Sequence, residues 1–444
     1  MQENNFINSQ LGNNNNLELK ERKISISTGT FLVISTMIGT GIFTTTGFMI
    51  KPIDSPLMIM FSWLLGGLFA LCGALSYAEL VTIFPKNGGE YNIITQVYNK
   101  ALGFCCAWIS LMVGFAAAIA SSAMAFGSYL STVFDINKTV AGLFLIIITS
   151  FIHTLKAEDG AKFQDLFTIG KIILIMTFII AGIFSGSFNS YPISGNELNY
   201  AFSPAFAVAL IYVSYAYSGW EAVGYIAGEM KEPNKSIPIS LFLGTAIVTL
   251  LYMGLNFVYL YMLPYKTLDG VEEIAAVAGK TLFGEIGSNF ISLLIAFGLI
   301  SAVGAMVISG SRMYEAVGQD FKKLSFFTKK NKNGIPINAI YFQMVISIIM
   351  FFSSAFDTLL KYIGFTISIF AGLGIFGVIL MRIKAPQLER TYKTFGYPLT
   401  PIIFVVLSLW MIFYSIFEEP KVALTGFGTI LIGFILYYFL KTDE

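Results

Sequence analysis

The 444-residue chain is 56% hydrophobic and only 12% charged, and its mean hydropathy is +0.74. Soluble domains usually carry about a quarter charged residues, so this composition excludes a water-soluble fold of this length. The net charge of +1 leaves no basic stripe that could follow a phosphate backbone, and nucleic acid is therefore not expected as a partner. The expected surroundings of the chain are a lipid bilayer.

The cysteines and the histidine give no sign of a metal or disulfide site. Cys72, Cys105 and Cys106 all lie in apolar runs, and the one histidine, His153, ends such a run. These positions provide neither a disulfide framework nor a metal-ligand spacing. No Ser-His arrangement for a membrane-embedded hydrolase is present either. We therefore expect no metal, no cofactor and no enzymatic activity.

The first 23 residues are polar and include an asparagine run from Asn13 to Asn16. This composition is typical of a disordered tail, which we place in the cytosol. The apolar segment that follows is too long for a signal peptide and lacks a small-residue cleavage pattern.

Apolar runs recur along the rest of the chain. Crossing a hydrocarbon core of about 30 Å takes about 20 apolar residues in a helix. We therefore predict an all-α integral membrane protein with about twelve transmembrane helices. The expected spans are 25–49, 57–84, 100–134, 138–156, 161–185, 203–230, 236–262, 286–316, 336–354, 359–382, 398–416 and 421–440.

The lysine and arginine distribution predicts the orientation of these spans. With the N-terminus inside, most of the 27 basic residues fall in inner segments. The outer loops then contain only Lys51, Lys138, Lys266, Lys280, Lys361 and Lys421. We expect a multi-pass protein of the plasma membrane with both termini in the cytosol. The longest outer segment, Leu263 to Gly287, is expected to be a surface loop, and a lid over a pathway is the alternative.

Two spans contain small residues near mid-depth. The first carries Gly39, Thr40 and Gly41, and the sixth carries small residues just before Trp220 and Glu221. Glycine weakens a helix by about 1 kcal/mol relative to alanine, and non-helical backbone at this depth is tolerated where it lines a cavity. Close helix packing by small residues is the alternative. Two interrupted helices at corresponding positions of two halves are typical of a transporter site built on inverted repeats.

Two ionisable residues lie deep in predicted spans. Lys171 is about ten residues into the fifth span, where a charge costs a few kcal/mol or more. Proton exchange and a fixed positive charge both fit Lys171, and snorkelling to the interface is the alternative. Glu221 could carry a proton during a transport cycle or serve as a structural partner for a hydroxyl such as that of Tyr225. Glu79 lies nearer a span end and is expected to be hydrated.

Several motifs resemble those of the amino acid/polyamine/organocation (APC) transporter superfamily. They are Gly39 to Phe43, Tyr77 to Leu80 followed by Pro85 to Tyr91, and Gly219 to Glu221 followed by Gly228 to Pro233 and by Ile237 and Pro238. Their order and spacing span most of the chain. The pattern is most similar to bacterial sodium-independent L-amino-acid transporters, which implies a bacterial inner membrane as the location.

The resemblance implies alternating access around a central site between five plus five inverted helices, with helices 1 and 6 broken and two more helices at the C-terminus. The expected domains are a first repeat at 24–185, a second at 186–382, and two helices with a short cytosolic tail at 383–444. The substrate-binding residues implied in the two breaks are Met37, Ile38, Gly39, Thr40, Gly41, Tyr215, Ser218 and Gly219. Amides at Thr40 and Gly41, with the Thr40 hydroxyl, would bind the substrate carboxylate, and carbonyls at Met37, Tyr215 and Ser218 would bind its ammonium group.

The third helix predicts the rest of the pocket. Leu111, Phe115 and Ala118 share a helical face by their spacing, and relatives place substrate-facing residues there. This apolar set favours a neutral substrate side chain, although a core-facing stripe would explain the same spacing. Ala305 on the eighth helix falls near a family gate position.

Two further features of the resemblance concern coupling and partners. Lys171 matches a fifth-helix lysine that, in sodium-independent relatives, occupies the place where sodium-coupled members bind the ion. Sodium dependence is therefore not expected. Animal members that pair with a glycoprotein heavy chain use a cysteine between the third and fourth helices. Residues 135–138 contain none, so no disulfide-linked heavy chain is expected.

The predicted function is secondary active transport of neutral L-amino acids, independent of sodium and either coupled to protons or run as exchange. A cationic amino acid or polyamine transporter is the first alternative. A transport-inactive amino acid receptor is the second, and it would normally need a substantial cytosolic domain.

Overall fold

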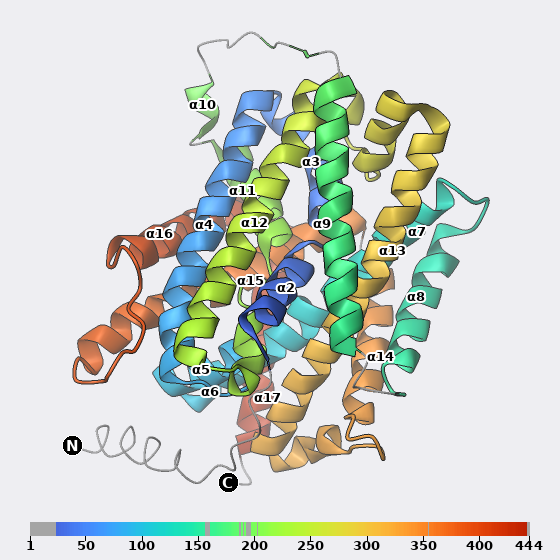
Figure 1. The fold of residues 1–444 in the computed structure, drawn as a ribbon. Coiled ribbons are helices and arrows are strands. Elements are labelled where there is room, and N and C mark those ends of the chain that lie inside the picture. Colours follow the sequence, from blue (N-terminus) through green and yellow to red (C-terminus); the bar gives the residue numbers. More distant parts are fainter. Residues whose placement is uncertain are drawn as a thin grey trace.

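The computed structural model describes residues 24–155, 160–185, 188, 189, 191, 197–201, 203–353 and 355–441. The predicted disordered tail, residues 1–23, lies outside the described residues. The described chain is almost entirely helical, and its only β-type pairings are two isolated bridges. Most helices run up and down through one bundle (Figure 1). The predicted all-α class is therefore confirmed.

The first part of the chain forms the first five predicted spans. They are α2 (Ile26–Met37) and α3 (Gly41–Ile53), α4 (Pro56–Ile83), α6 (Lys100–Ile109) continued by the π-helix η2 (Ser110–Ala117) and α7 (Ala118–Ser131), α8 (Lys138–Ile152) and α9 (Gly160–Ser185). A short helix, α5 (Gly89–Val97), lies between α4 and α6. The first span therefore consists of two helices, as its glycines predict.

The second part of the chain forms the remaining spans. They are α11 (Pro204–Tyr217) followed by the 3-10 helix η3 (Ala222–Glu229), α12 (Pro233–Tyr261), α13 (Ile274–Asp320), α14 (Ile337–Ser353), α15 (Phe356–Lys384), α16 (Leu399–Glu418) and α17 (Pro420–Lys441). Short helices are α10 (Leu198–Ala201), η4 (Tyr265–Leu268) and η5 (Lys322–Thr328). The sixth span is thus also interrupted, between α11 and η3.

Among the described residues, 9 helical segments are long and apolar enough to cross a bilayer. The apolar helices α8 and α14 are shorter, and α11 with η3 occupies the remaining predicted position. The chain is therefore a multi-pass membrane protein. Its division into inverted repeats at 24–185 and 186–382 stays a prediction.

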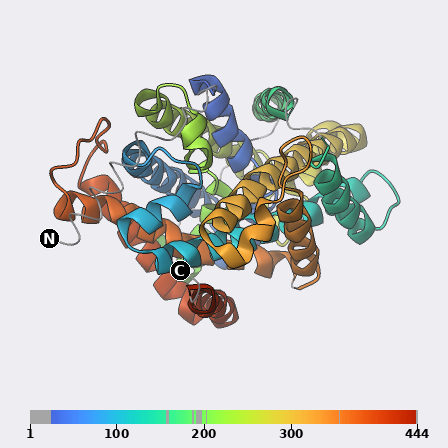
Figure 2. The ribbon, with the colours of Figure 1, turned by 90° about the horizontal axis from the view of Figure 1, so that it is seen from below.

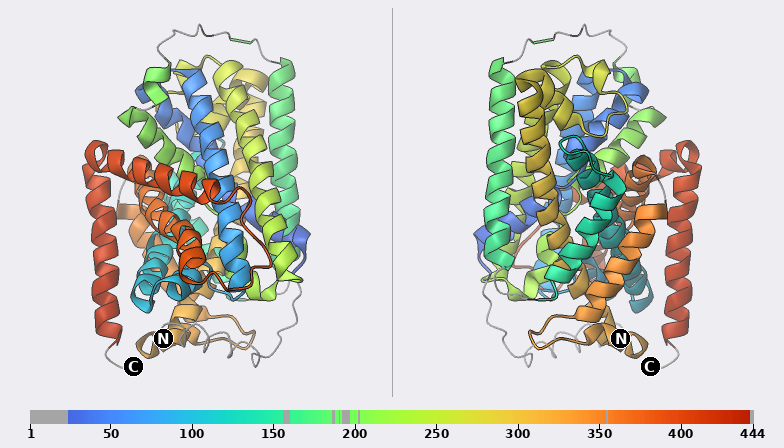
Figure 3. Two further views of the ribbon diagram at one scale, coloured as in Figure 1. Left: turned by 90° about the vertical axis from the view of Figure 1, so that its left-hand side faces the viewer. Right: turned by 90° about the vertical axis from the view of Figure 1, so that its right-hand side faces the viewer.

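Large apolar side chains are exposed on the outer faces of the bundle. Phe184 on α9 is 86% exposed and Leu424 on α17 is 76% exposed. Helices α9 and α17 stand at opposite outer edges (Figure 3), and the end-on view also places α17 at the edge (Figure 2). Apolar surface on this scale is not tolerated by a soluble monomer, so these faces are suited to lipid.

The longest outer segment packs against α3. The Gly270 amide donates to the Gly47 carbonyl at 3.1 Å, and Leu268 and Ile274 are fully buried. A Cβ at Gly47 would lie only 2.4 Å from the Val271 carbonyl oxygen, so the close contact requires glycine there. The segment lies at the surface, with Lys266, Asp269 and Lys280 exposed, but its buried apolar residues tie it to the first span. The lid alternative stays a prediction.

Glu79, at the end of α4, is buried instead of hydrated. It is 1% exposed and accepts hydrogen bonds from Arg382 Nε at 2.9 Å and Nη2 at 2.7 Å. The backbone amide and the hydroxyl of Thr394 also donate to it, each at 2.7 Å, and Arg390 Nε lies 3.2 Å away. Position within the span could not reveal these partners, which come from α15 and the loop after it.

Candidate functional site

The first break lies between α2 and α3, at residues 38–40. Ile38 has φ −76° and ψ 78°, outside the helical region, and the helix resumes at Gly41. A Cβ at Gly41 would lie 2.5 Å from the Cα atom of Ala216 in α11. At Gly39, by contrast, a Cβ would have no described atom within 4 Å. Gly41 therefore lets the two broken helices touch, whereas Gly39 lies within the break itself, where glycine weakens the helix.

The second break lies between α11 and η3, at residues 218–221. Gly219 has φ +100°, a conformation that favours glycine, and a Cβ there would lie 2.9 Å from the backbone of Thr36. The Gly219 amide donates to Oε2 of Glu221 at 3.2 Å. An acidic side chain thus accepts from an amide that the break exposes, next to the N-terminal end of η3, where a negative charge is favoured.

Side chains join the backbones of the two breaks. The Thr36 hydroxyl donates to the Gly219 carbonyl at 3.0 Å. The Tyr252 hydroxyl of α12 lies 2.6 Å from the Met37 carbonyl oxygen and 3.1 Å from that of Ala216. These contacts hold the broken segments at a fixed separation.

A third hydroxyl connection lies nearer α7. The Tyr215 hydroxyl is 2.6 Å from the Thr40 hydroxyl and 2.9 Å from that of Ser121. Thr40 is 1% exposed and Ser121 is fully buried. This chain of hydroxyls connects the first break, the second broken helix and the third span.

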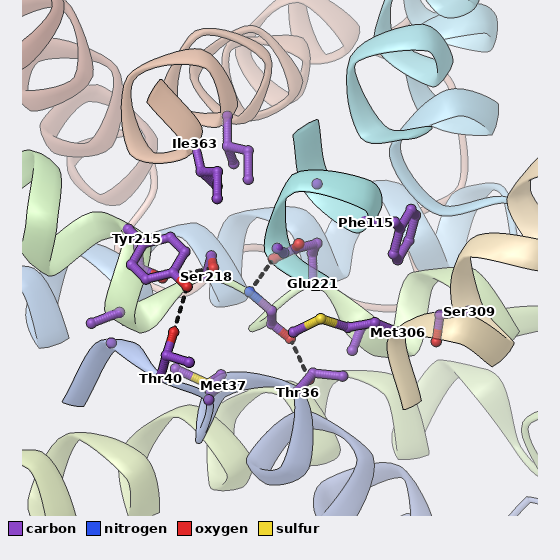
Figure 4. A pocket seen from close by; sticks show the side chains of 18 of the residues that line it. Thr36, Met37, Thr40, Phe115, Tyr215, Ser218, Glu221, Met306, Ser309 and Ile363 are labelled. Carbon is purple, nitrogen blue, oxygen red and sulfur yellow. Dashed lines mark hydrogen bonds between the residues drawn. The ribbon is translucent and has the colours of Figure 1, made fainter. Parts of the chain in front are cut away.

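A cavity of about 80 Å³ lies between the two breaks (Figure 4). One buried water needs on the order of 10–15 Å³ of such space, so several waters or a small zwitterion fit. Its polar side chains are Thr36, Thr40, Tyr215, Ser218, Glu221, Tyr225 and Ser309. Its apolar wall is formed by Met37, Phe115, Ala118, Ala216, Ala222, Met306, Ile363 and Ile367. Such a mixture suits a ligand with charged ends and a partly apolar body.

The structure brings most of the sequence-predicted substrate residues to this cavity. They are Met37, Gly39, Thr40, Gly41, Phe115, Ala118, Tyr215, Ser218 and Gly219. Glu221, predicted as a coupling residue, also lines it. Ile38, Leu111, Ala305 and Lys171 are not part of the lining.

Helix register explains two of these differences. Leu111 and Phe115 were placed on one α-helical face, but both lie in the π-helix η2, whose i→i+5 hydrogen bonds widen the turn. Gly114 lines the cavity beside Phe115 instead, and the Leu111 carbonyl accepts from Tyr314 at 3.1 Å. On α13, Met306 and Ser309 share the lining face by their spacing of three, and Ala305 is buried outside it.

The comparisons with known proteins agree with this architecture. A family model described as "Amino acid permease" matches residues 24–440. The chain belongs to this family. The predicted resemblance to APC transporters is thereby confirmed, and the permease is a transporter of amino acids and no enzyme.

Relatives match along nearly the whole permease. The serine/threonine exchanger SteT of Bacillus subtilis (strain 168) is 30% identical over 432 residues, covering 95% of this chain and 97% of the relative. The human cystine/glutamate transporter is 28% identical, covering 94% and 85%. The mouse large neutral amino acids transporter small subunit 2 is 26% identical, covering 94% and 81%.

Two carbonyls that were predicted to bind the substrate ammonium already accept two hydrogen bonds each. The Met37 carbonyl accepts from the Gly39 amide at 2.8 Å and from Tyr252. The Tyr215 carbonyl accepts from the Ser218 amide at 3.0 Å and the Ser218 hydroxyl at 2.7 Å. A carbonyl oxygen has two lone pairs, so both of these oxygens are fully used. The Ser218 carbonyl accepts none of these bonds and is therefore the best placed of the three predicted carbonyls to accept a further hydrogen bond.

Lys171 lies behind the first break and outside the main cavity. It is 8% exposed, which rules out the snorkelling alternative, and its ammonium donates to the Ile38 carbonyl at 3.3 Å. Apolar residues surround it, among them Ile175 and Leu299. The permease therefore places the Lys171 amino group on a carbonyl at the C-terminal end of α2, where a positive charge is favoured.

Sequence reasoning missed several residues of the site. They are Thr36, Gly114, Ser121, Tyr252, Met306, Ser309, Ile363 and Ile367. Hydroxyls inside apolar spans, such as those of Ser121 and Tyr252, were an available signal, because polar groups within a bilayer usually bond across helices. The apolar members carried no such signal.

Proposed function

We propose that this permease carries neutral L-amino acids by alternating access, with the charged ends of the substrate bound at the two breaks. The observation that carries the proposal is the cavity between two unwound segments. The first amides of α3, at Gly41, have no acceptor within their helix and suit a carboxylate, and the Thr40 hydroxyl lies beside them. The Ser218 carbonyl, at the C-terminal end of α11, suits an ammonium group.

The wall opposite the breaks supports a neutral side chain. Phe115, Met306, Ile363 and Ile367 offer apolar contacts, which favour an apolar or weakly polar ligand group. Two relatives are named for serine and threonine and for large neutral amino acids. A third, named for cystine and glutamate, indicates that the substrate can change within this architecture.

One observation favours the alternative of a cationic amino acid or polyamine. The Glu221 carboxylate lines the cavity, and no lysine, arginine or histidine of the described residues forms an ion pair with it. A positively charged substrate side chain would supply such a partner. Competition between neutral and cationic amino acids therefore decides between the two substrate classes.

For coupling, we propose sodium-independent transport, either by exchange or together with a proton. The Lys171 ammonium already binds the Ile38 carbonyl, and positive charge at this carbonyl makes a nearby sodium ion unfavourable. The bacterial relative named as an exchanger supports exchange. Glu221, exposed to the cavity, is the proposed proton carrier.

The proposed location is a bacterial inner membrane, which the resemblance to bacterial sodium-independent transporters implies. The lysine and arginine asymmetry supports the proposal that both termini lie in the cytosol. We propose no disulfide-linked partner. Cys105 and Cys106 are buried and Cys72 is partly buried, and the residues between α7 and α8, 132–137, include no cysteine.

Purified protein in proteoliposomes tests the function. Labelled neutral amino acids should enter vesicles in sodium-free buffer, faster when the vesicles contain unlabelled substrate. An absolute requirement for sodium would contradict the proposal. Strongest competition by lysine, arginine or polyamines would establish the cationic alternative. Thermal stabilisation by amino acids without uptake under any gradient would establish the receptor alternative.

A further inference from the structure

A second buried carboxylate lies behind the cavity. Glu90 is in the first turn of α5 and is 6% exposed. A thiol is the partner of its carboxylate, since Sγ of Cys106 lies 3.9 Å from Oε2. Within the described residues, neither Glu90 nor Glu221 forms an ion pair with a basic side chain. A buried carboxylate without a cation is costly in its charged form.

The backbone brings α5 against the second break. Gly88 and Gly89 have φ +116° and +57°, which lets the start of α5 press against the ring of Tyr225 in η3. A Cβ at Gly89 would lie 2.4 Å from that ring, and the Gly88 amide donates to the Tyr225 carbonyl at 3.4 Å. Tyr225 itself lines the cavity. Glu90 therefore follows directly after the residues that contact the cavity wall.

A buried hydroxyl without a partner lies in the same region. Tyr77 of α4 is 1% exposed, and its hydroxyl has no hydrogen-bond partner among the described residues. The Tyr77 ring packs edge-on against Trp220 at 5.6 Å, and a Cβ at Gly224 would lie 2.7 Å from the Tyr77 hydroxyl. A hydrogen-bond donor is thus available beside the second break, on the side where α5 packs.

The surrounding charges favour a proton on this group. Burial, and then the charge of Glu221, raise the pKa of Glu90. The titratable groups that face it are Tyr77 from α4, Cys106 from α6, and Tyr225 with Glu221 from the second break. From α15, which also packs on α5, the basic Arg382 is bound to Glu79. Two like charges in such a site cannot both be present, and the groups titrate as a pair.

We propose that Glu90 and Glu221 form one proton-binding site, in which a single proton is shared between a residue at the cavity and a residue behind it. The inference rests on the proposed function and adds Glu90 to Glu221 as a second residue of the proton-binding site. Water supplies the proton, one carboxylate becomes a carboxylic acid, and the same proton returns to water later in the cycle. The hydroxyls of Tyr77 and Tyr225 and the thiol of Cys106 provide the neighbouring donors.

The test compares Glu90→Gln, Glu221→Gln and Glu229→Gln in proteoliposomes, with exchange measured at equal internal and external pH across a pH series. Glu229 is the matched control, since it bonds Asn87 in the same region at 3.0 Å but has no part in the pair. Glu90→Gln should move the midpoint of the profile down by about one pH unit, because Glu221 loses a neighbouring negative charge. Glu221→Gln should flatten the profile, and Glu229→Gln should keep the wild-type midpoint.

A wild-type midpoint in Glu90→Gln, with active wild-type protein, would overturn the shared site and leave the proposed function intact. Absence of uptake by the wild type under all gradients would instead overturn the proposed function. If Glu90→Gln does not fold, infrared titration of the wild type gives a second readout. A protonated-carboxyl band that persists into the neutral range supports the pair, and a band lost entirely in the ordinary carboxyl range overturns it.

Discussion

An ionisable side chain lies at each of the two breaks, and the two are of opposite sign. Lys171 reaches the first break from α9, and Glu221 belongs to the second. At the first break, the Lys171 ammonium donates to the Ile38 carbonyl at 3.3 Å. At the second, the Glu221 carboxylate accepts from the Gly219 amide at 3.2 Å. Both arrangements follow the polarity of helix ends, where carbonyls at a C-terminus attract cations and amides at an N-terminus attract anions.

The two groups differ in their access to the cavity between the breaks. Lys171 is surrounded by apolar side chains on the far side of the first break, whereas Glu221 lines the cavity itself. The first charge is therefore suited to holding an unwound segment in shape, and the second to responding to substrate or protons. Variants at each break test this division.

Gly41→Ala should have the largest effect, because it forces the two breaks apart. Its new Cβ would lie 2.5 Å from backbone in α11, and overpacking costs about 1–3 kcal/mol. We expect loss of exchange and a lower melting temperature in detergent. Gly39→Ala is the control for folding, since no described atom lies within 4 Å of its Cβ. Normal exchange by Gly41→Ala would show that transport does not depend on the close contact between Gly41 and α11.

Replacing Lys171 should have the next largest effect. An ion at a partly buried helix end contributes up to about 2 kcal/mol, so we expect Lys171→Ala to slow exchange by about tenfold or more. Lys171→Met keeps most of the side-chain volume and separates lost charge from lost packing. Initial rates of exchange are measured for both variants in sodium-free proteoliposomes. Wild-type rates in both variants would contradict the proposed role of the charge.

Thr40→Val should weaken substrate binding by a smaller amount. One hydrogen bond contributes about 1 kcal/mol, so affinity should fall about five-fold for ligands with a free carboxylate. Amino alcohols, which lack that group, should be unaffected. Thr45→Val removes a buried hydroxyl that bonds the Gly41 carbonyl at 2.8 Å outside the lining and serves as control. Competition assays measure the change, and equal affinities would contradict the assignment of the carboxylate to the first break.

The smallest expected effect concerns stability and pH at Glu90. Because the pKa of Glu90 is raised above its ordinary 4.5, the folded protein binds more protons than the unfolded chain. Stability should therefore fall as pH rises from 4.5 towards the raised value. Glu90→Gln cannot lose stability in this way. The difference in melting temperature between the variant and the wild type should therefore shift in favour of the variant as pH increases. If the melting temperatures of the variant and the wild type change with pH in the same way, Glu90 is ionised in the folded state.

Local signals in the sequence were sufficient to predict the two breaks. Glycines near the middle of an apolar span weaken the helix wherever they occur, and each break contains one of them, Gly39 in the first and Gly219 in the second. The burial of Glu90 was not predictable in this way. It depends on the positive φ angles of Gly88 and Gly89 and on a tyrosine ring from a distant part of the chain.

Residue spacing was also an incomplete guide to which face of a helix meets the cavity. The position of Leu111 was predicted from ordinary α-helical periodicity, and a π-helical stretch changes that periodicity. For Glu79, the decisive partners, Arg382 and Thr394, come from the far end of the chain. Pairings of this kind require the tertiary structure.

The bare backbone contact at Gly41 has a consequence for how such a protein can diversify. If main-chain groups and the Thr40 hydroxyl bind the carboxylate and ammonium groups that all amino acids share, the substrate side chain contacts Met306, Ile363 and Ile367 on other helices. Those three residues can then be substituted without changing how the carboxylate and ammonium groups are bound. A change of substrate preference therefore needs few substitutions, and these fall on helices other than those that carry Gly41 and Gly219.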